Sequence, residues 1–448
     1  MIDGLRVISP LSFHAAGFAV FFQPPFLPRL PVRHRMVAGT FVLATIVLFD
    51  RIMISVAREP VVEALDLTDK QWGWVLSVFA LGYALFQAPA GYAADRFGAR
   101  RLLTVVVSLW SAFTALTGAV TGFVQLIVVR FLFGAGEAGA FPGIARAVYR
   151  WIPTGERGVV NGVNFSGGRL GGAVALVAMP ALIDWAGWRL AFVYLGAVGV
   201  AWALWWWWWF RDDPAAHGSV GAAELAVIEA NTEAAVGPVA TPSGPVSLSA
   251  KRLLADRNML LLAGQYFASN FTFYFTLSWL FPYLRRTYEL TPAEAGAYSA
   301  ATLIAGALGN WASGWLVDRL YVTGSLARSR RVPAIAGFVL AAAGVLASVY
   351  MTSPGWAVVA LGVAVFGADM TLSPSWSACV DVGQAASGTV SGTMNMAGNI
   401  GSFATSLPFP YLLAAFGSPT PFFFLAAGLN ALAIVAWMGI RPERAIGR

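Results

Sequence analysis

Cysteine, histidine and charge are all scarce in this sequence of 448 residues. The single cysteine, Cys379, excludes an intramolecular disulfide framework and any metal site built on several thiolates. The three histidines, His14, His34 and His217, lie outside the long apolar stretches, so we expect no metal site or imidazole relay there. Charged residues make up 11% of the chain, against about 25% in a soluble globular protein. Most of the surface is therefore expected to face lipid.

Long apolar stretches dominate what is present, and the chain is 58% hydrophobic. Twelve stretches are each long enough to cross roughly 30 Å of hydrocarbon as a helix. The expected spans are 36–57, 73–95, 101–121, 123–148, 158–182, 187–210, 258–284, 293–318, 331–351, 355–381, 386–411 and 417–440. The sequence therefore predicts an all-α membrane protein with twelve transmembrane helices in a lipid bilayer.

The net charge of +7 is distributed by membrane side. If both termini are cytoplasmic, 21 of the 29 Lys and Arg residues lie on the cytoplasmic side and 5 in the outer loops. The other 3 are Arg51, Arg130 and Arg169, inside spans. This positive-inside pattern predicts a multi-pass protein of the inner or plasma membrane with cytoplasmic termini, and it gives no reason to expect nucleic acid as a partner.

One long polar segment divides the chain into six spans and six. We expect a cytoplasmic N-terminal arm, a first six-helix bundle, a cytoplasmic linker with amphipathic helices, a second six-helix bundle and a cytoplasmic tail; their ranges are 1–35, 36–210, 211–257, 258–440 and 441–448. Within the linker, 222–234 is the clearest helical piece.

The two halves repeat each other. The run from Gly91 to Asp95-Arg96 ends span two, and the run from Gly314 to Asp318-Arg319 ends span eight. A weaker repeat places an acid five residues before a proline in spans four and ten, as Glu137 with Pro142 and Asp369 with Pro374. Two parallel repeats predict two bundles related by a pseudo-two-fold axis, with a binding site at their interface.

Ionisable residues inside the spans are the strongest functional signal. Arg130 and Glu137 are seven residues apart, close to two helical turns, so both lie on one helix face. A charge in hydrocarbon costs roughly 3 kcal/mol or more, so that face should border a protein interior or an aqueous cavity. Asp50-Arg51, Arg169 and Asp369 repeat this anomaly.

The intramembrane charges balance, with three arginines against three acids (Arg51, Arg130 and Arg169; Asp50, Glu137 and Asp369). Protonation of an acid would free an arginine for an anion, so proton and anion would bind cooperatively, as symport requires. The alternative for Arg130 and Glu137 is a purely structural ion pair. Arg169 is either a ligand contact or a packing-level partner of Glu137, and Asp369 is either a second proton site or a buried counter-charge.

Several motifs resemble those of a known family. Gly91-x-x-x-Asp95-Arg96-x-Gly98-x-Arg100-Arg101 resembles the signature loop of the major facilitator superfamily. Three further stretches resemble the anion:cation symporter family, which includes hexuronate, galactonate and phthalate permeases and vesicular glutamate and sialic acid transporters. They are Phe49-Asp50-Arg51 with Ser55, the run from Arg130-Phe131 to Phe141-Pro142 with Trp151 to Arg157 after it, and Gly388 to Gly401.

The resemblance implies roles for individual residues. Asp50 and Glu137 fall where relatives carry proton-coupling acids, and Arg51 and Arg130 where they bind a substrate carboxylate. The other implied substrate-site residues are Tyr83, Asn270, Tyr274 and Asn395. The implied inner gate is Asp95, Arg96, Arg100 and Arg101, with Asp95 against the start of span eleven near Ser387. Leu48 stands where relatives often have tyrosine, and Arg169 and Asp369 are outside the family pattern. We interpret Asp381 as a surface helix cap.

The sequence thus predicts a transporter, not an enzyme. It contains no G-x-x-x-x-G-K-[ST] loop and no H-E-x-x-H motif. We therefore expect no catalytic residues, no metal and no cofactor beyond a coupling ion. We expect that ion to be a proton. The expected function is a monomeric symporter that imports a small organic anion, a sugar acid or another carboxylate. The alternatives are an exporter or exchanger without proton coupling, and a nutrient-sensing receptor.

Overall fold

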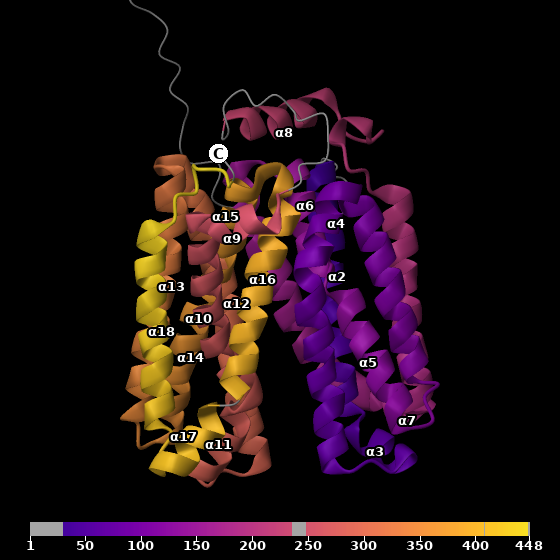
Figure 1. The fold of residues 1–448 in the computed structure, drawn as a ribbon, viewed down its shortest axis with the longest axis vertical. Coiled ribbons are helices and arrows are strands. Elements are labelled where there is room, and N and C mark those ends of the chain that lie inside the picture. Colours follow the sequence, from indigo (N-terminus) through magenta and orange to yellow (C-terminus); the bar gives the residue numbers. More distant parts are fainter. Residues whose placement is uncertain (1–29, 235–247, 407, 447–448) are drawn as a thin grey trace, which may run out of the picture.

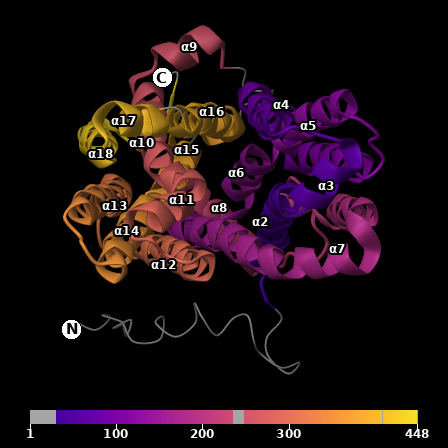
Figure 2. The ribbon, with the colours of Figure 1, turned by 90° about the horizontal axis from the view of Figure 1, so that it is seen from below.

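The computed structural model describes residues 30–234, 248–406 and 408–446. Two helical bundles stand side by side, as Figures 1 and 2 show from two directions. The linker crosses one end of the molecule, called here the linker side, and the other end is called the open side. Residues 1–29, which hold most of the expected N-terminal arm, lie outside the described part of the chain.

The first bundle is built from the chain before the linker. Its helices are α2 (Val32–Val56), α3 (Arg58–Leu65), α4 (Asp69–Thr117), α5 (Phe123–Glu137), α6 (Ala140–Trp151) and α7 (Arg157–Trp209), with a single turn η1 (Thr154–Glu156). The linker carries η2 (Pro214–Ala216), α8 (Ala222–Ala234) and α9 (Ala250–Ala255). The α8 helix has the bounds expected for the helical piece of the linker.

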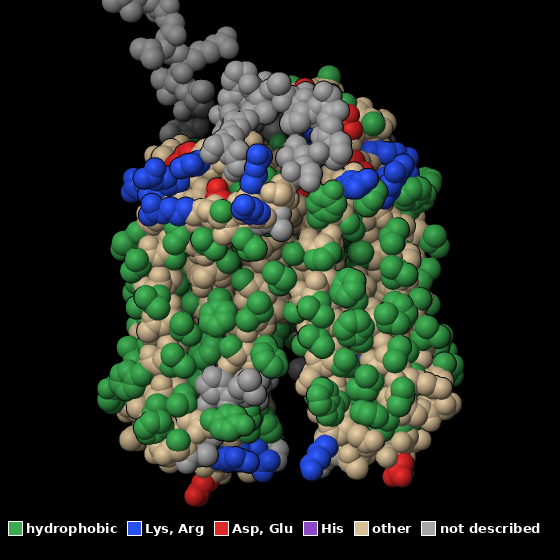
Figure 3. Space-filling model, viewed as in Figure 1, with side chains coloured by type: hydrophobic (Ala, Val, Ile, Leu, Met, Phe, Trp, Pro, Cys, Tyr) green, Lys and Arg blue, Asp and Glu red, His purple; other side chains and the backbone are tan. Residues whose placement is uncertain are grey.

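The second bundle follows the linker. Its helices are α10 (Arg257–Ser278), α11 (Leu280–Thr287), α12 (Pro292–Thr323), α13 (Leu326–Val349), α14 (Pro354–Met370), α15 (Leu372–Gly383), α16 (Ser387–Ser406), α17 (Pro408–Phe416) and α18 (Thr420–Gly439), with a turn η3 (Gln384–Ala386). Buried apolar side chains fill each bundle, and apolar side chains cover the flanks that Figure 3 shows.

The described helices follow one another in the order of the twelve crossings that the sequence predicts. Seven helical stretches among the described residues are long and apolar enough to cross a membrane. In α4 and α7 the crossings are separated at Gly98 (φ 82°) and Gly187 (φ 76°). These left-handed φ values favour glycine because it has no Cβ. Each of the two glycines therefore allows a sharp corner between consecutive crossings.

Two prolines break corresponding crossings in the two bundles. Pro142 lies near the start of α6 and Pro374 near the start of α15, and each lacks the N–H that would bond the carbonyl four residues earlier. In the second bundle the hydroxyl of Ser313 donates instead to the carbonyl of Met370. The breaks place Glu137 at the end of α5 and Asp369 near the end of α14, so the acid–proline repeat has a common structural basis.

The linker is fastened to the first bundle through the start of α2. The backbone N–H groups of Val32 and Arg33 donate to the Glu224 carboxylate of α8 at 3.1 and 3.0 Å. The Arg33 guanidinium also pairs with Glu156 at 3.0 Å. Burial alone raises the pKa of Glu156, but hydrogen bonds from His34 and Arg33 outweigh it and hold that pKa below its ordinary value.

Candidate functional site

A cavity lies between the two bundles near their middle. It is lined from α2, α4, α6, α7, α10, α14, α15 and α16 by Leu48, Arg51, Tyr83, Phe141, Asn164, Phe165, Gly168, Arg169, Tyr266, Ser269, Asn270, Phe273, Tyr274, Asp369, Leu372, Trp376, Asn395 and Asn399. Figure 3 shows the bundles separated by a hollow on the open side and joined toward the linker side. Six of the seven residues expected to bind substrate line this cavity; Arg130 does not.

Arg51 and Glu137 form an ion pair within the first bundle. The Arg51 Nε donates to Glu137 Oε1 at 2.5 Å. The two side chains differ in exposure, since Arg51 is 19% exposed and Glu137 is 0% exposed. Neither Arg51 Nη2 nor Glu137 Oε2 has a hydrogen-bond partner. The pair therefore presents its cation toward the cavity and keeps its acid behind.

Two aromatic rings support the Arg51 head. Its guanidinium carbon lies 4.3 Å from the centre of the Tyr83 ring and 5.5 Å from that of Phe79, within the range of cation–π attraction. Tyr83 in turn meets the second bundle, because the Asn395 side-chain amide lies 3.5 Å from its hydroxyl oxygen. Asn395, from α16, thus lies next to the residue that positions Arg51.

Arg130 and Asp50 lie behind the cavity wall. Arg130 is 3% exposed, and its guanidinium lies 4.9 Å from the ring centres of both Phe79 and Phe133. Asp50 is 2% exposed, and its Oδ2 accepts from Trp110 Nε1 at 3.1 Å, while its Oδ1 has no partner. The structure therefore places Arg130 away from the cavity, although the family resemblance implies substrate contact. The Phe79 ring lies near both arginines, 4.9 Å from the Arg130 guanidinium and 5.5 Å from that of Arg51.

Arg169 and Asp369 form a two-point ion pair between the bundles. Arg169 Nε donates to Asp369 Oδ2 at 2.9 Å and its Nη2 to Oδ1 at 2.7 Å. The Arg169 guanidinium carbon lies over the Phe273 ring, 3.8 Å from its centre. Asn310 donates to Asp369 from behind at 3.3 Å. Of the two interpretations of Arg169, a packing partner of Glu137 is therefore wrong: its partner is Asp369, in the other bundle.

The remaining expected cavity residues come from α10. Asn270 and Tyr274 both line the cavity. The Asn270 amide donates to the backbone carbonyl of Tyr266 at 2.9 Å, which leaves its carbonyl oxygen for other partners. A Cβ at Gly398 would collide with Tyr266 and approach Asn270, so the close packing of α16 on α10 depends on that glycine.

Asp95 joins the bundles at the linker side. Its carboxylate accepts from the backbone N–H groups of Gly388 and Thr389 at 2.8 and 2.6 Å, and from the Thr389 hydroxyl at 2.6 Å. These groups form the start of α16, where the helix dipole favours an anion. The other expected gate residues stay within their own bundle: Arg100 donates to the carbonyl of Trp207, and Arg96 lies near Phe97. Arg101 is exposed.

Asp318 makes the matching contact from the second bundle, and the sequence comparison of the halves did not assign it this role. Its carboxylate accepts from the backbone N–H groups of Gly158 and Val159 at 2.8 and 2.7 Å, at the start of α7. The repeat of Gly91 to Arg96 as Gly314 to Arg319 was the signal that pointed to it. The two halves thus close the linker side by the same contact, each capping a helix of the other.

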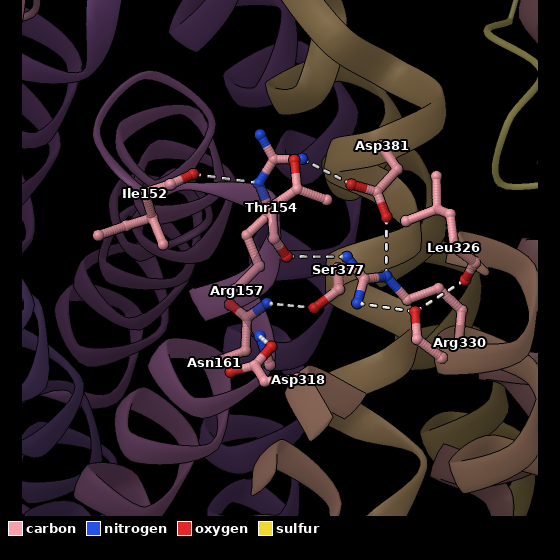
Figure 4. Close-up of polar contacts among 11 residues, drawn as sticks. Ile152, Thr154, Arg157, Asn161, Asp318, Leu326, Arg330, Ser377 and Asp381 are labelled. Carbon is pink, nitrogen blue, oxygen red and sulfur yellow. Dashed lines mark hydrogen bonds and ion pairs between the residues drawn. The ribbon is translucent and has the colours of Figure 1, made fainter. Parts of the chain in front are cut away.

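Asp381 is a buried member of this closure, so its interpretation as a surface cap is wrong. Its carboxylate accepts from Arg157 at 2.6 Å and from Arg330 at 2.8 Å, and all three side chains are at most 3% exposed (Figure 4). Arg157 belongs to the first bundle and Arg330 to the second. Arg330 also donates to the carbonyl of Thr154. Two converging arginines from separate bundles make the carboxylate a bridge, which spacing along the chain does not reveal.

Comparison with known protein sequences identifies the family of this chain. The family model of the Major Facilitator Superfamily matches residues 40–406. The chain belongs to this superfamily. It has relatives among the organic-anion branch: a probable sulfoacetate transporter of Cupriavidus necator (32% identity; 92% of this chain and 95% of that protein) and a probable galactarate/D-glucarate transporter of Bacillus subtilis (30%; 90% and 90%). A D-galactonate transporter of Escherichia coli is 28% identical (91% and 96%).

Solved structures of the superfamily share the fold. The human organic anion transporter MFSD10 matches with a TM-score of 0.68 at 15% identity, covering 93% of this chain and 100% of that one. The superfamily transporter FucP, in its outward conformation, matches with a TM-score of 0.67 at 15% identity, covering 91% and 99%. With these relatives, the chain is a transporter of the anion:cation symporter type within the superfamily and not an enzyme.

Proposed function

We propose that this chain imports a small organic anion together with protons by alternating access, with the linker side facing the cytoplasm. The relatives are named for sulfoacetate, galactarate, D-glucarate and D-galactonate, which are all anions. A sugar acid or another carboxylate is therefore the proposed cargo, and H⁺ the coupling ion. Lys and Arg side chains gather at the linker side on the face that Figure 3 shows, which supports the orientation by the positive-inside rule.

The observation that carries this proposal is the exposure difference within the pair of Arg51 and Glu137. An anion in the cavity reaches the guanidinium, whereas Glu137 is fully buried behind it. An incoming carboxylate would compete with Glu137 for Arg51. A proton on Glu137 removes that competition. It also avoids an ionised carboxylate without a counter-ion, which would be costly inside a membrane protein. Anion and proton thus favour each other's binding, and this linkage is reciprocal.

The buried acids Asp50 and Glu137 fit this scheme as the groups that bind the coupling protons. Asp50 has one oxygen without a partner, as Glu137 does. Arg130 is close enough to interact electrostatically with both acids, so we assign it to balancing their charge in this conformation. Tyr83, Asn395, Asn270 and Tyr274 supply the neutral polar contacts to the substrate.

Alternating access requires the linker-side contacts to break when the cavity opens inward. In the described conformation Asp95 and Asp318 cap helices of the opposite bundle, while the open side is separated. This is an outward-facing arrangement in the proposed orientation. Arg96, Arg100 and Arg101 extend the inner gate by keeping the corner of α4 at Gly98 and the end of α7 in place through contacts such as that of Arg100 with Trp207.

The test uses purified protein in sealed vesicles that contain a pH-sensitive dye. Sulfoacetate, galactarate and D-galactonate are added outside in turn, and we expect at least one of them to acidify the interior. Its accumulation should collapse when a protonophore is added. The Arg51→Gln variant should lose both signals, whereas Arg286→Gln, which removes an exposed cation of α11 at the open side, should keep them. Uptake without acidification, insensitive to the protonophore, would instead establish an exchanger or a uniporter.

A further inference from the structure

Two separate guanidinium groups face the cavity. Arg51 projects from α2 and Arg169 from α7, and both line the cavity wall. Each already holds a carboxylate, Glu137 for Arg51 and Asp369 for Arg169. The charge-balance argument for substrate binding therefore applies to each of these two sites and not to Arg51 alone.

The two cavity pairs differ from the buried ion pairs at the linker side in the exposure of their arginines. At the linker side, Arg157 and Asp381 are both 3% exposed, and Arg330 is 0% exposed. In the cavity, Arg51 is 19% exposed against 0% for its acid, and Arg169 is 17% exposed against 2%. A pair that only holds helices together has no need to keep its cation open. The cavity thus offers two cations, whereas Glu137 is fully enclosed and Asp369, although it lines the cavity, is almost fully covered.

The two arginines project from helices that pack closely against each other. A Cβ at Gly168 would press on Leu48, and one at Gly171 would collide with Thr45, so α7 lies directly against α2. Since Arg51 follows Leu48 by three residues, its backbone lies about one helical turn, ~5 Å, from the level of Arg169 along the axis. Because both arginines line this one cavity, a substrate with two anionic groups joined by a few carbon atoms can meet both.

We propose that the cavity selects a small dianion, with one anionic group on Arg51 and the other on Arg169, each replacing the acid that now occupies that arginine. The proposal rests on the proposed function and specifies its substrate class. Arg169 lies over the Phe273 ring and uses Nε and Nη2 for Asp369, so the same planar fork suits a carboxylate or a sulfonate. The names of the relatives include anions with one acidic group and with two, and they do not decide between these classes.

The charge balance of the two sites leads to a stoichiometry. With Glu137 and Asp369 ionised, the two cavity arginines are already neutralised, and an arriving dianion would leave two negative charges uncompensated. One proton on each acid restores neutrality. Each anionic group of the substrate thus requires one proton, and a dianion enters with two.

The test compares ligands that differ in one acidic group. Galactarate and D-galactonate have the same carbon skeleton, as do D-glucarate and D-gluconate, and in each pair a carboxylate replaces a terminal hydroxymethyl group. Binding of each to the purified full chain is measured by titration calorimetry at mildly acidic pH. We expect the dianion of at least one pair to bind about tenfold more tightly or better, the scale of one charge-assisted hydrogen-bonded pair.

A double variant assigns the second anionic group to Arg169. Arg169→Gln with Asp369→Asn removes both charges together, so no buried charge is left without a partner. We expect the preference for the dianion to disappear, so that the affinity ratio within each pair of ligands falls to about one. Arg169→Lys, which keeps the charge but not the fork, should lose part of the preference. Arg286→Gln is the control for a change in net charge and should keep it.

The outcomes separate the two proposals. Equal affinity for both members of each pair in the unmodified protein, or a double variant that keeps the preference, overturns the dianion proposal and leaves anion transport intact. If the double variant does not fold, the affinity ratio of the unmodified protein and the Arg169→Lys variant still decide. Binding of no member of either pair, together with no transport of sulfoacetate in the vesicle assay, overturns the proposed function itself.

Discussion

The two acids paired with the cavity arginines are much less exposed than their basic partners. Glu137 is fully buried, and in the described part of the chain one of its oxygens is on Arg51 and the other has no partner. Asp369 lines the cavity but has both oxygens engaged, by Arg169 and by Asn310. A carboxylate in such a place is stable as an ion only while its arginine stays. The two acids are thus sensitive to what occupies the cavity.

Replacing Glu137 by glutamine separates binding from coupling. The amide keeps the shape of the side chain and mimics a permanently protonated acid, so Arg51 is always available to the anion. We expect exchange of labelled substrate across vesicles to persist, while accumulation driven by a proton gradient is lost. A Glu137→Gln protein that still concentrates substrate with a proton gradient would remove Glu137 from the proton path.

At the scale of elements, close helix contacts act together with the side-chain caps and the Asp381 bridge to hold the linker side shut. A Cβ at Gly91 of α4 would collide with the backbone of Gly388 in α16, and one at Gly158 of α7 would collide with Gly314 in α12. The caps by Asp95 and Asp318 lie next to these two crossings. Such backbone contact is sensitive to one added side chain, because the neighbouring atoms belong to helices and cannot move aside.

A bulky residue at Gly91 should therefore force the linker side open. We expect Gly91→Leu to lengthen, by several ångströms, the distance between spin labels placed on Phe97 and Arg328, which are exposed at the linker side of the two bundles. Uptake of substrate should fall because the outward-facing state is depopulated.

The matched control is Gly73→Leu in the same helix, where a Cβ meets nothing within 4 Å. It should leave the label distance unchanged. The native thiol, Cys379, is buried and is replaced by serine in both proteins, so that only the introduced positions are labelled. An unchanged distance in Gly91→Leu would show that the glycine contact does not set the conformational balance.

For the molecule as a whole, the membrane-embedded charges sum to zero, with three arginines against three acids (Arg51, Arg130 and Arg169; Asp50, Glu137 and Asp369). A neutral interior avoids the cost of an uncompensated charge in a low-dielectric medium. If every substrate charge is matched by a proton, the loaded transporter is neutral as well. Both the empty and the loaded forms then reorient without moving net charge across the membrane.

Uptake should consequently respond to the pH gradient and not to the membrane potential. In vesicles with a potassium gradient, valinomycin sets the potential at either sign, and we expect the initial rate of galactarate uptake to be the same at both. The same vesicles with an inward proton gradient should show faster uptake. A rate that changes with the sign of the potential would mean that fewer or more than two protons accompany each dianion.

Much of this protein is determined by local sequence. The cost of placing polar groups in hydrocarbon acts on each residue where it stands, so the twelve crossings, the charged positions within them and the two related bundles were predictable. The cap of Asp95 on the start of α16 also follows from a motif. The corner at Gly98 follows from the backbone freedom of glycine.

The pairing of the charges was decided only by the tertiary structure. That Arg169 meets Asp369 across the bundles, that Arg130 does not line the cavity, and that Asp381 bridges two buried arginines all depend on the distances between helices far apart in the chain. A sequence states which charges must find partners in the membrane. Which partner each one finds depends on how the helices pack, and that packing is set by many other side chains.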